Sequence, residues 1–158
     1  MNQAEYMALA EFRYQLRRFL RNMEEKTRDA GLKPQQYQLL LAIKGLPRDV
    51  APTISALAER MQLNHNSAVE LVDRCAERGL VSRLRTGSDR RHVTLSITPE
   101  GDVLLQKLAN AARQELRSIG PVLVESVESV LGVIEDRRTK KQSPAESKKK
   151  TGAKKVGP

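Results

Sequence analysis

The residue types best suited to binding chemistry lie in the middle of the chain, where four arginines accompany a single acid. These residues are Arg83, Arg85, Asp89, Arg90 and Arg91. Two runs of alternating character, residues 81–85 and 92–97, flank a turn-rich segment at 86–89, and this pattern predicts a β-hairpin. Guanidinium groups at such a turn suit phosphate oxygens and a narrow minor groove, where negative potential is concentrated. The alternative is a solvated hairpin with ordinary surface charge.

The residues before the hairpin predict two short amphipathic helices joined by a tight turn. Thr53 is a suitable N-cap for the first helix, and Gly79 is a suitable C-terminal residue after the second. The buried face of the second helix is predicted to contain Ala68, Leu71, Val72 and Cys75. A helix, a turn, a second helix and a basic hairpin together form a winged DNA-binding unit.

The polar side of the second helix supplies the other candidates for DNA contact. They are Asn64, His65, Asn66, Ser67, Glu70 and Arg74. Asn66 suits adenine edges, Ser67 suits bases or phosphates, and Glu70 could accept a hydrogen bond from cytosine N4. His65 suits a phosphate near the helix start. Two structural alternatives stay open: an asparagine of this set caps the helix, and Glu70 pairs with Arg74 four residues later.

The sequence offers little for catalysis, metal binding or redox chemistry. No nucleophile with a base, no phosphate-binding glycine loop and no pair of carboxylates stands out, so we expect neither an enzyme nor a cofactor. His65 and His92 lack partners at metal-ligand spacing. The single cysteine, Cys75, excludes an intramolecular disulfide. Its place on an apolar helix face favours a core residue over an oxidation sensor, because such a site raises the thiol pKa and limits access.

The net charge of +9 comes almost entirely from one end of the chain. Residues 137–158 hold nine of the 28 basic residues and one of the 19 acidic residues, so residues 1–136 are nearly neutral. The composition of 137–158 predicts a disordered, lysine-rich tail. Such a tail either adds salt-dependent, non-specific DNA affinity or only increases solubility. Evidence for DNA binding must therefore come from the positions of the arginines in residues 1–136.

Helices with apolar stripes are predicted on both sides of the DNA-binding unit. One spans residues 3–30 and ends at Gly31, and another begins at Pro34. The helical pattern from residue 99 to 136 is predicted to break at Gly120-Pro121. Because the stripes of 3–30 and 99–136 need a partner, we expect a homodimer, with residues 53–98 as the DNA-binding lobe. The fold class expected is mainly α with a small β-hairpin wing.

The run LAERMQLNHNSAVELVDRCAERGLVSRLRTGSDRRHVTLSITPEG, with GLKPQQYQLLLAI before it, resembles the MarR family of bacterial and archaeal winged-helix transcription regulators. The similarity covers residues 31–105. It implies a dimer that binds a palindromic operator in double-stranded DNA, as a repressor released by a small molecule or by oxidation. By position, Arg91 would enter the minor groove, and Asp89 would hold the wing tip by pairing with an arginine. Glu70 and Cys75 depart from the family pattern.

The resemblance also implies an effector pocket where the first, second and fifth helices meet the DNA-binding lobe. Arg13, Arg17 and Tyr37 are candidates to line it. No apolar stretch is long enough for a signal peptide or a membrane span, so we expect a bacterial or archaeal cytoplasmic protein associated with the nucleoid. The alternative function is an architectural nucleoid protein that binds duplex DNA without sequence preference.

Overall fold

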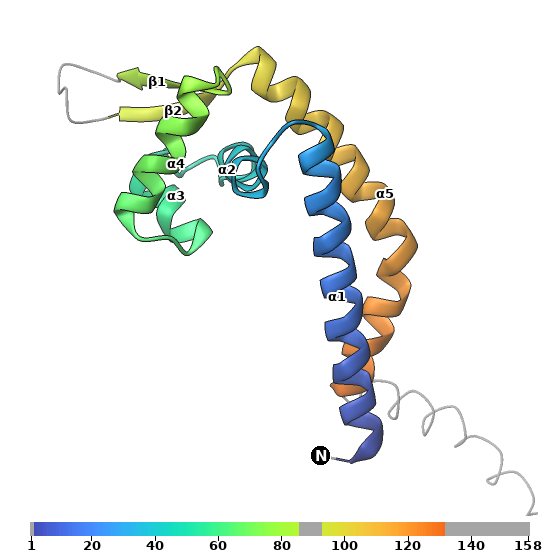
Figure 1. Ribbon diagram of the computed structural model, residues 1–158. Coiled ribbons are helices and arrows are strands. Elements are labelled where there is room, and N and C mark those ends of the chain that lie inside the picture. The colour runs from blue at the N-terminus through green and yellow to red at the C-terminus, as the bar shows by residue number, and fades with distance from the viewer. Residues whose placement is uncertain (1, 86–92, 132–158) are drawn as a thin grey trace, which may run out of the picture. The chain divides into compact units, whose positions relative to one another are not determined.

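A computed structural model describes residues 2–85 and 93–131 of the 158-residue chain (Figure 1). Along the chain it contains α1 (Gln3–Asp29), α2 (Pro34–Lys44), α3 (Ile54–Met61), α4 (His65–Glu77), β1 (Val81–Arg85), β2 (Val93–Ile97) and α5 (Pro99–Val130). β1 and β2 pair antiparallel, from Val81 opposite Ile97 to Arg85 opposite Val93. The fold class predicted from the sequence, mainly helical with one small hairpin, is confirmed.

The chain forms two compact units, which we describe separately. The central unit consists of residues 18–118, and the terminal unit combines residues 1–17 with residues 119–158. The central unit therefore extends beyond the predicted DNA-binding lobe of residues 53–98, because α2 and parts of α1 and α5 pack into the same core. The predicted tail at 137–158 lies outside the described residues.

The core of the central unit is aliphatic and joins every element of that unit. Its most completely buried side chains are Leu39, Leu40, Leu57, Leu71, Val72, Cys75 and Leu108. Leu95 of β2 and Leu105 of α5 extend the same cluster. The backbone N–H of Leu95 also donates to the carbonyl of Pro52, 2.9 Å away, so the segment before α3 is attached to the hairpin. This core fixes α4 and the hairpin on one rigid support.

Three helices of the central unit end in the same way, with a residue of positive φ followed by a leucine. The positive-φ residues are Gly31 after α1, Gln62 after α3 and Gly79 after α4. After each, the leucine N–H bonds to the carbonyl five residues earlier, as in Leu80 to Cys75 at 2.9 Å, which is the Schellman pattern. Gly31 and Gly79 reach this conformation without the strain that a side chain brings. The sequence predicted both glycine stops correctly.

The start of α5 is packed tightly against the start of the hairpin. The Thr98 hydroxyl donates to the Gly79 carbonyl at 2.6 Å and accepts from the Gly101 N–H at 3.1 Å, so Thr98 caps α5. A Cβ at Gly101 would lie 2.2 Å from the carbonyl oxygen of Leu80. This close approach explains why the segment after the hairpin needs a glycine in its first helical turn.

The helix α5 continues through Gly120 and Pro121, so the predicted break at these residues is wrong. Part of the conflict between a proline and a helix is a clash with the Cβ of the preceding residue, and Gly120 has no Cβ. One lost backbone donor is then insufficient to end a helix of 32 residues. Among the described residues, no helix has both the length and the apolar character needed to cross a membrane.

The terminal unit has a small interior and a large exposed apolar surface. Ala8, Gln15, Ile119 and Ser126 are buried within it. Its exposed apolar side chains are Tyr6, Met7, Tyr14, Leu16, Val122, Val124, Val127 and Leu131, with Leu131 reaching 70% exposure. The stripe predicted on the first helix is therefore only partly covered by the chain itself, since Leu16 is exposed.

Candidate nucleic-acid interface

The helix α4 presents one buried face and one polar face, as its periodicity predicted. Ala68, Leu71, Val72 and Cys75 are buried, and each is at most 3% exposed. Asn66, Glu70 and Arg74 are exposed and follow one another at steps of four, so they form a stripe along the opposite side. The start of such a helix, with its short polar side chains, is the part that enters a DNA major groove in helix-turn-helix proteins.

Asn64, and not Asn66, caps the start of α4. Its Oδ1 accepts a hydrogen bond from the Ser67 N–H at 2.8 Å, so Asn66 is not the capping residue. Glu70 and Arg74 form an i,i+4 ion pair at 3.6 Å with both side chains exposed. A pair of this kind contributes only about 0.3–0.5 kcal/mol, and either side chain can leave it for another partner. His65 is exposed at the first helical position.

Arg83 is bound to α4 rather than free at the surface. By register, Arg83 lies opposite Leu95, on the face of the hairpin that meets the core. Its Nη2 donates to Oδ1 of Asp73, and both side chains are partly exposed. The pair neutralises the carboxylate of Asp73. It also attaches β1, through Arg83, to α4, through Asp73.

The tip of the predicted wing lies outside the described residues. Asp89, Arg90, Arg91 and His92 all belong to the segment 86–92, and their roles remain predictions. Arg85 ends β1 and pairs with Val93 across the hairpin.

Cys75 is fully buried among the core residues of the central unit. Burial raises the pKa of its thiol to about 11, against a smaller opposite effect of Arg74 and Arg78. A buried thiol of high pKa is a poor nucleophile. The position predicted for Cys75 on the apolar helix face is confirmed. Within residues 2–85 and 93–131 there is also no group of three His, Cys, Asp or Glu side chains that could hold a metal ion.

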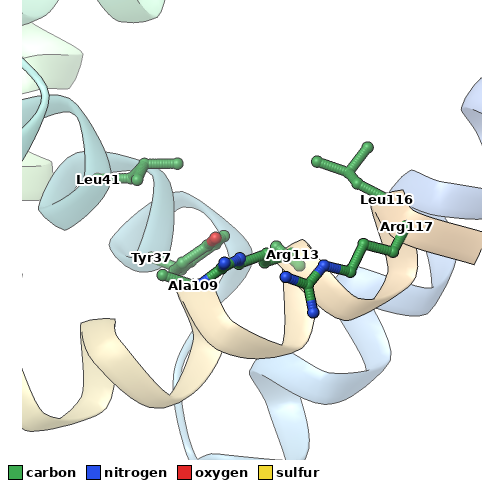
Figure 2. A pocket seen from close by; sticks show the side chains of 7 residues that line it. Tyr37, Leu41, Ala109, Arg113, Leu116 and Arg117 are labelled. Atoms are coloured by element: carbon green, nitrogen blue, oxygen red, sulfur yellow. The ribbon is translucent and has the colours of Figure 1, made fainter. Parts of the chain in front are cut away.

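A pocket of about 400 Å³ opens between α2 and α5 inside the central unit (Figure 2). Its lining consists of Tyr37, Leu41, Ala109, Ala112, Arg113, Leu116 and Arg117. Tyr37 is 8% exposed, and burial raises its pKa. Figure 2 shows that Arg113 and Arg117 come from α5 and extend toward the tyrosine side of the pocket. Most of the remaining lining is apolar, so the pocket combines an apolar wall with two guanidinium groups.

Only one of the three predicted pocket residues, Tyr37, lines this pocket. Arg13 and Arg17 are exposed on α1 and belong to the terminal unit, so they are not part of the lining. Sequence reasoning missed Arg113 and Arg117. Their signal was a pair of arginines four residues apart beside the apolar stripe of α5, but the sequence did not indicate which helix faces them.

The helix-turn-helix and the hairpin define a winged-helix protein, and comparisons with known proteins agree. Residues 30–92 match the MarR family. The HTH-type transcriptional repressor MdtR of Bacillus subtilis is 29% identical over 86 residues, which are 54% of this chain and 54% of MdtR. The chain thus spans about half the length of this curated relative.

Solved structures extend the likeness of fold to both units. AbsC, a MarR family transcriptional regulator from Streptomyces coelicolor, has a TM-score of 0.64 at 19% identity, over 89% of this chain and 97% of AbsC. A cysteine-to-serine mutant of MarR from E. coli, crystallised in complex with operator DNA, has a TM-score of 0.59 at 18% identity, over 84% of this chain and 90% of MarR. These structures show the likeness of fold, and the match to the MarR family itself is confined to residues 30–92.

Proposed function

We propose that this protein is a dimeric transcription regulator that binds a palindromic operator and releases it when a small molecule binds. In this proposal α4 is the recognition helix. Asn66, Ser67 and Glu70 contact base edges, His65 and Arg74 contact phosphates, and the segment 86–92 carries Arg90 and Arg91 to the minor groove. Two such units, related by a two-fold axis, match half-sites separated by about 34 Å.

The observation that carries the proposal is the arrangement of α4 and β1. The polar stripe of α4 is exposed while its other face is completely buried, and the Arg83–Asp73 ion pair attaches the hairpin beside it. A negative charge near phosphates would oppose binding, and the pair removes that charge from Asp73. The exposed positions therefore combine groups that read base edges with groups that bind phosphate.

Competition between selected and random DNA tests sequence-specific binding. A duplex selected by the full chain from a random library should stay bound in a large excess of random duplex. The Asn66→Ala variant should bind the selected duplex about tenfold more weakly, which corresponds to about 1.4 kcal/mol. Arg21→Ala is a matched surface control, because Arg21 pairs with Glu25 on α1 at 3.2 Å. Equal affinity for selected and random DNA would instead favour an architectural protein.

The exposed apolar surface of the terminal unit supports the proposed dimer. Eight large apolar side chains remain exposed there, from Tyr6 on α1 to Leu131 after α5. A large apolar patch is rare on a soluble monomer and often marks an interface. Light scattering at micromolar concentration should give twice the mass of 17.7 kDa. A monomeric mass would contradict both the dimer and the palindromic operator.

The pocket between α2 and α5 is the proposed effector site. Its apolar wall would bind an apolar ring, and the guanidinium groups of Arg113 and Arg117 would bind an anionic group on the same molecule. We therefore expect release of the selected duplex by amphipathic organic anions. Benzoate and its larger aromatic analogues are suitable first probes. The Arg113→Ala/Arg117→Ala double variant should lose the response to these anions but keep its DNA affinity in their absence.

A further inference from the structure

Arg78, the residue that follows α4, joins the end of this helix to the junction between α1 and α2. Its Nη1 donates to Oε1 of Gln36 at 2.8 Å, and its Nη2 donates to the carbonyl oxygen of Gly31 at 2.8 Å. The two acceptors come from segments more than 40 residues earlier in the chain. All three residues belong to the central unit.

Both acceptors are held in place by local structure. Gln36 is 3% exposed, and its Oε1 also accepts from the Lys33 N–H at 3.0 Å, which caps the start of α2. Gly31 has a φ of 77° and forms the stop of α1, with Leu32 buried directly behind it. A planar guanidinium that spans two fixed acceptors defines a direction as well as a distance. Arg78 therefore restrains the angle at which α4 leaves the core.

The restraint acts at the end of α4 that is far from the proposed DNA-contacting end. The helix has 13 residues, so its ends are about 20 Å apart. A tilt of a few degrees at residue 78 moves the side chains at residues 65–67 by on the order of 1 Å. Base-edge hydrogen bonds do not tolerate such a displacement, whereas phosphate contacts through long side chains do.

We propose that Arg78 is a positioning residue for sequence recognition. Through its hydrogen bonds to the α1–α2 junction, it keeps α4 aligned with the base edges. This inference rests on the proposed function. In this proposal the guanidinium acts through its hydrogen bonds to Gln36 and Gly31 and not through a contact with DNA. Tyr37, which lines the pocket between α2 and α5, directly follows Gln36, so the same junction connects the pocket to α4.

The test compares the affinities of the full-length dimer for two probes, a duplex selected by the wild-type chain and a pool of random duplex. The Arg78→Ala variant should bind the selected duplex at least tenfold more weakly, with unchanged affinity for the random pool. The salt dependence of random-pool binding should also be unchanged, because no phosphate contact is lost. Gln36→Leu should reproduce this loss, and Gln36→Glu should retain wild-type affinity because its carboxylate accepts both hydrogen bonds.

Arg28→Ala serves as the matched control, since it removes one exposed arginine near Gly31 that pairs with Glu24 on its own helix, 3.8 Å away. It should leave both affinities within a factor of two. A uniform loss on both probes with a smaller salt slope would make Arg78 a phosphate contact and overturn the proposal, as would unchanged binding by Arg78→Ala. If the wild-type chain selects no duplex at all, the proposed function fails and this inference fails with it.

Discussion

The two compact units of this chain differ in how completely they bury their own apolar side chains. The central unit has a continuous core from Met23 to Leu108, with many side chains at 0–3% exposure. The terminal unit buries Ile119 but leaves Val124 and Leu131 at 57% and 70% exposure. Helices of similar amphipathic pattern thus differ in how much of their apolar surface the chain itself buries. The central unit has a continuous core of its own, although Leu84 and Val103 stay exposed, and the terminal unit has a small interior and apolar surface that the proposed second copy would cover.

The largest effect should come from adding one methyl group to the central unit. In Gly101→Ala the new Cβ would meet the Leu80 carbonyl oxygen at 2.2 Å and the Ile97 Cγ2 at 3.0 Å. The Leu80 backbone cannot move away without disturbing the start of the hairpin. We therefore expect the free energy of unfolding to fall by about 3 kcal/mol. Urea denaturation measures the change. Glu100→Ala, at the exposed neighbouring position, should change stability by less than about 0.5 kcal/mol.

A charge in the terminal unit should instead act on association. Met7→Asp and Val124→Asp each place a carboxylate on the exposed apolar surface, where the side chains are 64% and 57% exposed. We expect each variant to raise the dimer dissociation constant at least a hundredfold, about 2.7 kcal/mol. Sedimentation equilibrium measures it. Gln114→Asp, on an exposed position of the central unit, should leave the constant unchanged; an equal rise there would indicate a general charge effect.

Cys75 provides a test that is specific to the complete core of the central unit. Burial raises its pKa to about 11, while an unfolded cysteine titrates near 9. Because the unfolded chain loses this proton first, the contribution to stability is complete below pH 9 and is lost as the pH rises toward 11. The stability of the wild-type chain should therefore fall more between pH 8 and 10.5 than that of Cys75→Ala. Parallel slopes would mean that the thiol is accessible to water in the folded state.

The smallest effect concerns the turn of the helix-turn-helix. Gln62 adopts a φ of 54°, where Gly31 and Gly79 occupy the equivalent positions after α1 and α4. Gln62→Gly would remove the side-chain strain of this conformation but raise the entropy of the unfolded chain. We expect a net gain of about 0.5 kcal/mol in unfolding free energy, measurable as a rise in Tm of about 2 °C. A loss of stability would show that the added entropy of the unfolded chain, or a lost contact of the Gln62 side chain, outweighs the relief of strain.

The sequence predicted the local parts of this molecule well. Pro34 at the start of α2, Thr53 at the cap of α3 and the positive-φ residues Gly31 and Gly79 are all where the pattern placed them. These predictions succeed because caps and stops depend on residues within four or five positions. The break at Pro121 was predicted wrongly: α5 continues through it, and the preceding glycine, which has no Cβ, removes part of the steric conflict.

The parts that could not be predicted are contacts between distant segments. The periodicity of α4 by itself determined which residues face the core, and the residue types determined which could meet nucleic acid. Only the packed structure decided that Arg83 neutralises Asp73, that Arg113 and Arg117 share a pocket with Tyr37, and that Arg78 reaches Gln36. Side-chain pairing of this kind depends on the angles at which helices cross in a shared core, and a linear pattern of apolar residues does not specify those angles.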